Sequence, residues 1–154
     1  MTGTIRSAVP DDWGAIKQLM DEAALPTDDL SESAAPLFYV HADGSRITGA
    51  IALEPLTKQS GMLRSLVVVP DARGRGVGHA LVEKVEAAAR SRRMTEIFLL
   101  TTTAHRFFSR LGYQRLDRDI APDAVKAHEQ FRALCPASAV LMSKRPGESR
   151  EQGA

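Results

Sequence analysis

The chain has 154 residues, of which 44% are hydrophobic and 25% are charged, so it suits one folded domain and is not wholly disordered. Twenty Lys and Arg against 19 Asp and Glu leave a net charge of +1, which gives no global field to attract nucleic acid or a membrane surface. The single cysteine, Cys135, excludes an intrachain disulfide and the paired-cysteine spacing of zinc sites.

The same features bear on location and on metals. A lone cysteine, no long apolar run and no signal-type N-terminal stretch are typical of a cytoplasmic protein, and we expect that location. The four histidines, at 41, 79, 105 and 128, match no metal-ligand spacing. We therefore expect no metal.

The first half of the chain predicts a strand, a helix and a hairpin. The expected elements are a strand at 4–9, an amphipathic helix at 13–23, and two hairpin strands at 37–40 and 47–53 around Asp43-Gly44. A strand at 61–69, a helix at 77–88 and a strand at 97–100 then form a βαβ unit. Its two apolar strands should run parallel with a right-handed crossover.

The remaining sequence predicts smaller elements. We expect a short helix at 104–111 ended by Gly112, a strand from 113, a helix at 124–134 and a closing strand at 136–142. The predicted fold class is α/β: a single domain over 1–144 with a mixed, mostly antiparallel central sheet, a parallel βαβ unit and flanking helices. Residues 145–154 are expected to be a disordered polar tail.

The turn at 70–79, between the buried strand and the amphipathic helix, carries the clearest chemical signal. Its alternating glycines let the backbone turn tightly, so that several amides can point at one anion beside the positive end of the helix dipole. Arg73 and Arg75 add positive charge. We predict a di- or polyphosphate ligand, with a glycine-rich helix cap bearing solvated arginines as the alternative.

Two common phosphate-binding motifs do not fit this turn. A Walker A loop needs Lys-Ser/Thr after its last glycine, whereas Gly78 is followed by His79 and Ala80. A GxGxxG dinucleotide motif needs a glycine at 79 and an acid where Thr101 stands. Magnesium NTP and NAD are therefore disfavoured.

The turn resembles the acetyl-coenzyme A loop of the GNAT superfamily of N-acetyltransferases, Arg/Gln-x-x-Gly-x-Gly/Ala, with Arg73, Gly76 and Gly78 in its fixed positions. Residues 104–113, AHRFFSRLGY, are similar to the family's second cofactor segment, Ala-x-x-Phe-Tyr-x-x-Leu-Gly-Phe. The resemblance covers nearly the whole chain and implies a GNAT-like fold, with acetyl-CoA as the cofactor.

The resemblance also implies which residues bind the cofactor. Backbone groups of Leu66, Val67 and Val68 would pair with the pantetheine arm, and the thioester would lie between the two parallel strands. Thr101 stands where the family often has an asparagine, and Phe108 stands where it has a proton-donating tyrosine. The residues implied at the pyrophosphate are Arg73, Gly74, Arg75, Gly76, Val77, Gly78 and His79.

A narrower resemblance is to the acetyltransferases associated with arsenic-resistance operons. It rests on the segments LRSL at 63–66, TTTA at 101–104 and LCPASA at 134–139. It implies an amino-acid-like substrate with an acidic group, such as an organoarsenical or a phosphinic compound. Inorganic arsenic is disfavoured because one cysteine cannot chelate it.

Acetyl transfer to an amine needs a base, because an amine of pKa about 9 is only about 1% neutral at pH 7. Glu54, at a strand end before Pro55, is the first candidate, and His105 is the second. The alternatives are a solvated strand-end acid and an exposed helix-start histidine. Strand amides around Val68 could stabilise the oxyanion.

Two further residues are candidates for the reaction. Phe108 cannot donate a proton, so the hydroxyl of Ser65, Thr103 or Tyr113 could protonate the departing thiolate. Arg64 could grip a carboxylate, phosphinate or arsonate with two parallel hydrogen bonds. Its alternative is a surface arginine paired with an acid.

The function predicted on these grounds is transfer of an acetyl group from acetyl-CoA to the amine of a small molecule. Because Phe108 replaces the family's acid, a non-catalytic module that binds or senses coenzyme A is the alternative. The expected partner is a small-molecule amine rather than nucleic acid or a membrane. Edge strands of the sheet are compatible with a homodimer.

Overall fold

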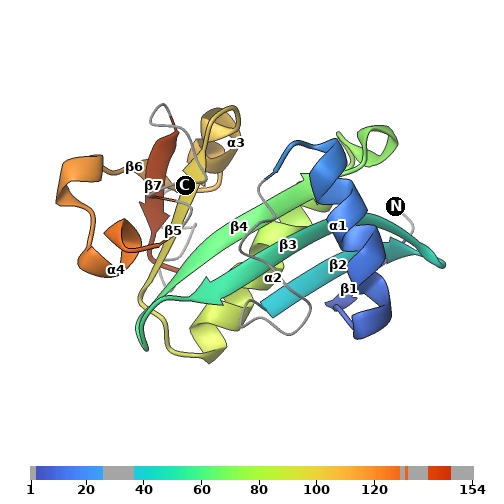
Figure 1. The fold of residues 1–154 in the computed structure, drawn as a ribbon, viewed down its shortest axis with the longest axis horizontal. Helices are drawn as coiled ribbons and strands as arrows, with labels where there is room; N and C mark the ends of the chain where they lie inside the picture. The colour runs from blue at the N-terminus through green and yellow to red at the C-terminus, as the bar shows by residue number, and fades with distance from the viewer. Residues whose placement is uncertain (1–2, 26–36, 129–130, 132–138, 147–154) are drawn as a thin grey trace. The chain divides into compact units, whose positions relative to one another are not determined.

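The computed structural model describes residues 3–25, 37–128, 131 and 139–146. The chain forms two compact units, Met1–Glu54 with Leu63–Ala87, and Pro55–Met62 with Ala88–Ala154. The seven strands are hydrogen-bonded in the order β1-β2-β3-β4-β5-β7-β6 (Figure 1). β4 contributes residues to both units, and each unit is described by itself.

The sheet of the first unit is built on a hairpin. β1 (Thr4–Ser7), β2 (Leu37–Asp43) and β3 (Arg46–Pro55) pair antiparallel, with Ile5 opposite His41 and Tyr39 opposite Ile51. β4 (Ser60–Val68) is next to β3 in the sheet. The predicted hairpin around Asp43-Gly44 is confirmed, with strands longer than the apolar runs alone indicate.

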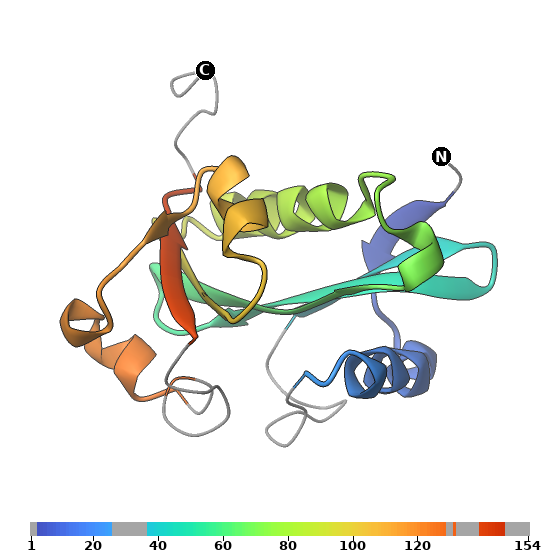
Figure 2. The same cartoon turned by 90° about the horizontal axis from the view of Figure 1, so that it is seen from above.

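Two helices cover the sheet of the first unit. α1 (Trp13–Glu22) lies on one face, and the part of α2 (Val77–Ser91) that belongs to this unit lies on the other (Figure 2). Both helices place their apolar residues at helical spacing, as predicted. The core under α1 includes Ile16, Leu19, Met20, Val40, Ala50, Val67, Val69 and Ala72.

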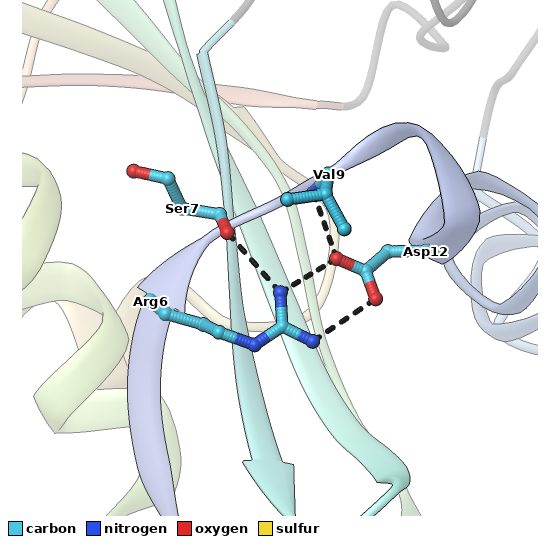
Figure 3. A network of polar contacts seen from close by, with 4 residues as sticks. All are labelled: Arg6, Ser7, Val9 and Asp12. Atoms are coloured by element: carbon cyan, nitrogen blue, oxygen red, sulfur yellow. Dashed lines mark hydrogen bonds and ion pairs between the residues drawn. The ribbon is translucent and has the colours of Figure 1, made fainter.

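A polar network fixes the start of α1 against β1. The guanidinium of Arg6 donates from Nη1 to Asp12 Oδ2 at 2.7 Å and from Nη2 to Oδ1 at 3.0 Å (Figure 3). Asp12 also accepts from the backbone amide of Val9 at 2.8 Å. The hydrogen bonds from Arg6 have the largest effect on the pKa of the Asp12 carboxyl, and together with the Val9 amide they hold it below its ordinary value.

Gly49 lets β3 and α2 approach closely. A Cβ atom at this buried position would lie 3.0 Å from Leu81 Cδ1, 3.1 Å from Val67 O and 3.2 Å from Val77 Cγ1. Leu81 and Val77 belong to the first turns of α2. The absence of a side chain at Gly49 therefore sets how deeply the helix start sits on the sheet.

The second unit contains the parallel pair. Residues Ser60–Met62 of β4 run parallel to β5 (Glu96–Thr101), and β5 pairs antiparallel with β7 (Val140–Lys144). β6 (Gln114–Arg115) extends β7, and α3 (His105–Arg110) ends before Gly112, whose φ is +97°. The predicted parallel βαβ unit and mixed α/β class are confirmed.

The C-terminal elements are described in part. Of the helix predicted at 124–134, the described residues include α4 (Asp123–Lys126), after which the His128 amide donates to Val125 O, three residues back, and Phe131, which is in a π-helical turn. The closing strand extends to Lys144 rather than ending at 142. Residues 129–130, residues 132–138 with Cys135, and residues 147–154 of the predicted tail lie outside the described residues. Within the described chain, no helix is both long and apolar enough to span a membrane.

Candidate active site

β4 carries a local irregularity at Ser65. Its φ is +62°, in the left-handed region that a serine adopts at a cost of about 1–2 kcal/mol. The Oγ atom is buried and has no hydrogen-bond partner among the described residues. A strained residue with an unsatisfied hydroxyl in the middle of a strand points to a functional constraint.

The two residues predicted as base and substrate anchor contact each other. Nη1 of Arg64 donates to Oε1 of Glu54 at 2.8 Å. The Arg64 side chain is 1% exposed and that of Glu54 is 24% exposed. The arginine is therefore buried, unlike the surface arginine of the alternative prediction, while the carboxylate still reaches solvent.

The turn after β4 is held by its own side chains. Pro70–Ala72 form a single 3-10 turn, and Arg73 donates from its backbone amide to Pro70 O at 3.3 Å. The Arg73 guanidinium folds back, and its Nε donates to Val68 O at 2.9 Å. One donor of this loop arginine is thus engaged at the end of β4.

An ion pair between β3 and the same turn could not be predicted from the sequence. Arg46, the first residue of β3, donates from Nη1 to Asp71 Oδ2 and from Nη2 to Oδ1, both at 2.8 Å. Hydrogen bonding to Arg46 lowers the pKa of the Asp71 carboxyl to about 2, and the charge of Arg75 acts in the same direction.

The glycine positions agree with a phosphate-binding turn. Gly74 and Gly76 have φ values of +80° and +83°, and a Cβ at either would meet no atom within 4 Å. The Ala80 amide makes its helical bond to Gly76 O, so the amides of residues 77–79 precede the first intrahelical donor. An exposed turn with two arginines and these leading amides is suited to a diphosphate.

The candidates of the second unit have structural contacts of their own. Oγ1 of Thr101 accepts the Ala104 amide at 3.0 Å, and His105 is the half-buried first residue of α3. Phe108 is buried and packs edge-to-face against Phe107 and Tyr113, with ring centroids 5.1 and 5.6 Å away.

In the first unit, the structure brings two pairs of predicted residues together: Glu54 with Arg64, and Arg73 with Val68. The sequence analysis did not identify Arg46, Asp71 or the close approach at Gly49. Asp71 lies within the predicted turn at 70–79, but Arg46 lies 25 residues earlier, so no local signal links them.

Comparison with protein families gives a match to the acetyltransferase (GNAT) domain over residues 34–115. An amino-acid acetyltransferase of Mycobacterium tuberculosis is 33% identical over 121 residues, which cover 73% of this chain and 69% of the relative. An uncharacterised N-acetyltransferase of Chlorobaculum tepidum is 32% identical over 88 residues, 57% of this chain. An amino-acid acetyltransferase of Ralstonia nicotianae is 33% identical over 127 residues, 77% of this chain. The chain spans 56% of the Chlorobaculum protein and 28% of the Ralstonia one.

Solved structures agree on the fold. A Mycobacterium tuberculosis protein in complex with CoA and NLQ superposes with a TM-score of 0.77 at 25% identity, over 92% of this chain and 98% of that one. An N-acetylglutamate synthase of Neisseria gonorrhoeae, with coenzyme A and N-acetyl-glutamate, gives a TM-score of 0.80 at 20% identity. That match covers 96% of this chain and 36% of the synthase.

Proposed function

Because this chain belongs to the GNAT family of acetyltransferases, we propose that it transfers the acetyl group of acetyl-CoA to the amine of a small, amino-acid-like molecule. Membership itself confirms the predicted fold, and it supports the predicted enzyme class of N-acetyltransferase and the predicted cofactor. The observation that carries the proposal is the exposed turn between β4 and α2, with its two left-handed glycines.

Cofactor binding is proposed at this turn and at the end of β4. Residues 73–79 would hold the pyrophosphate through the leading amides of α2, through Arg75 and through the Nη donors of Arg73, whose Nε donates to Val68 O. Backbone groups of residues 66–68 would take the pantetheine arm. When bound, acetyl-CoA supplies an activated acetyl thioester.

Glu54 is proposed as the base that takes a proton from the acceptor amine. The hydrogen bond from Arg64 Nη1 to Oε1 at 2.8 Å holds the Glu54 carboxylate in place near the end of β3. The 24% exposure of Glu54 leaves it accessible to a substrate. His105 remains the second candidate.

Ser65 is proposed to donate its hydroxyl proton toward the departing thiolate. Its buried Oγ has no partner among the described residues, so the proton is not already engaged there. Strand amides near Val68 would meet the negative charge that develops on the carbonyl oxygen. The Val69 amide is not among them, because it donates to Thr48 O at 2.9 Å.

The acceptor class is proposed from the relatives. Two of them are amino-acid acetyltransferases, and one solved neighbour holds N-acetyl-glutamate. Arg64 would recognise an acidic group on the acceptor by exchanging part of its contact with Glu54 for that group. The narrower proposal is an amino acid whose side chain bears an arsenic or phosphinic acid.

The test is release of the coenzyme A thiol from acetyl-CoA with a panel of acceptors. The panel contains glutamate, glutamine, a phosphinic glutamate analogue and an arsenic-bearing amino acid. Turnover with any of them supports acetyl transfer, and preference for the last two supports the narrower proposal. Binding of coenzyme A without turnover of any acceptor would favour the sensing module.

Glu54→Gln tests the base directly. The kcat/KM for the best acceptor should fall by about 100-fold or more, since general-base catalysis contributes at least that factor. Glu22→Gln is the matched control, because Glu22 is an exposed carboxylate of α1 bonded only by Gln18 in the described contacts. Equal activity of the two variants would remove Glu54 from the mechanism.

A further inference from the structure

We propose that Arg46 and Asp71 form a positioning pair for the phosphate-binding turn, in which Arg46 anchors the turn to β3 and neutralises Asp71. This inference rests on the proposed function of the turn. Neither residue belongs to the motif that identifies the turn, and the pair is visible only in the fold.

The geometry of the pair is that of a fixed clamp. Both guanidinium Nη atoms donate to separate carboxylate oxygens at 2.8 Å, a two-pronged arrangement that restricts rotation as well as distance. Arg46 opens β3 directly after the hairpin turn, and Asp71 is the middle residue of the Pro70–Ala72 turn. The clamp therefore links a strand to the start of the proposed binding turn.

The turn needs such an anchor because its own packing is sparse. Ala72 and Val77 are buried, while the four residues between them are exposed and include two left-handed glycines. Glycine positions of this kind are conformationally permissive. Two sets of hydrogen bonds keep its start in place: those from Arg46 to Asp71, just before the exposed span, and the one from Arg73 to Val68 O.

Charge gives Arg46 a second role. Asp71 is ionised at neutral pH, since its pKa lies at about 2, and both Arg46 and Arg75 act on it. Without Arg46, the Asp71 charge would oppose an incoming diphosphate. It would also attract the Arg75 guanidinium, which the ligand would otherwise use.

Arg46→Ala tests the pair, and Arg6→Ala is its matched control. Arg6 also forms a two-pronged bond to an aspartate, at 2.7 and 3.0 Å, but at the start of α1. Both variants remove one positive charge, so a global charge effect is the same in both. Coenzyme A is titrated calorimetrically into each protein, and amide hydrogen exchange is followed at residues 70–80 without ligand.

The expected result is a loss of coenzyme A affinity of roughly two- to fivefold in Arg46→Ala, within the range of exposed ion pairs, since the side chains of Arg46 and Asp71 are 57% and 66% exposed. Exchange at residues 70–80 should be faster in this variant, and Arg6→Ala should match the wild type in both measurements. Adding Asp71→Asn to Arg46→Ala should recover part of the affinity, because the opposing charge is then gone. Arg46→Lys, which keeps the charge without the two-pronged bond, should lie between wild type and Arg46→Ala.

Affinity and exchange that are equal in Arg46→Ala and wild type would overturn the inference while leaving the proposed function intact. No recovery in the double variant would overturn the electrostatic half of it. A wild-type protein that binds no coenzyme A would overturn the proposed function and this inference together.

Discussion

Replacement of Gly49 by alanine tests the packing that places the start of α2. Its φ lies outside the left-handed region, so alanine can adopt the backbone conformation. The added Cβ, however, would meet Leu81 Cδ1, Val67 O and Val77 Cγ1 at 3.0 to 3.2 Å. The two side chains can give way, but the Val67 carbonyl is fixed in β4.

The magnitude follows from two opposing effects. Overpacking a well-filled core costs about 1–3 kcal/mol, and Gly→Ala recovers about 0.4–1 kcal/mol by restricting the unfolded chain. The free energy of unfolding should therefore fall by about 1–2 kcal/mol, which lowers the Tm by about 2–8 °C for a chain of this size. Coenzyme A affinity should also fall, because Val77 is the first residue of α2 and its displacement would move the amides proposed to bind the pyrophosphate.

Gly14→Ala is the control with the opposite expected sign. Gly14 is exposed on α1, and a Cβ there would meet nothing within 4 Å. Alanine should stabilise the helix by about 0.5 kcal/mol, since it is the better helix former. Urea unfolding of both variants measures the difference. A Gly49→Ala protein as stable as Gly14→Ala would refute the close approach of β3 and α2.

Two further predictions concern the turn and the N-terminal network. Gly76→Ala should be strained, because the backbone there has a φ of +83°, and it should weaken coenzyme A binding. Gly44→Ala, at a φ of +63° in the hairpin, should cost similar stability and leave binding unchanged. Equal affinities of the two variants for coenzyme A in calorimetry would contradict this prediction. Asp12 has a pKa lowered first by Arg6 and also by the Val9 amide, so its stabilisation is present above the ordinary pKa of about 4 and is lost as pH falls below it. Asp12→Asn should therefore lose less stability than wild type between pH 5 and pH 3 in urea unfolding, and identical losses would show that the network contributes nothing.

Most of the fold could be predicted because the relevant signals are local. Apolar spacing in α1 and α2, doubly apolar runs in β4 and β5, and the Asp43-Gly44 turn each determine their element within a few residues. The glycine turn is likewise identified by adjacent residues. Because these signals are local, the glycine motif and the predicted βαβ unit indicate the same fold as the family match.

The missed features depend on residues far apart in the chain. Arg46 and Asp71 are 25 positions apart, and nothing near Arg46 indicates which acid it meets. The left-handed φ of Ser65 is imposed on a residue that prefers other conformations, so propensity cannot reveal it.

Binding of coenzyme A compared with binding of pantetheine, which lacks the pyrophosphate and the phosphoadenosine attached to it, tests the role of residues 73–79 most directly. Calorimetry on the wild-type chain should give an affinity for coenzyme A at least tenfold higher than for pantetheine, because the leading amides of α2 and Arg75 have an anion to contact only in the former. Equal affinities for the two compounds would contradict a pyrophosphate site at this turn.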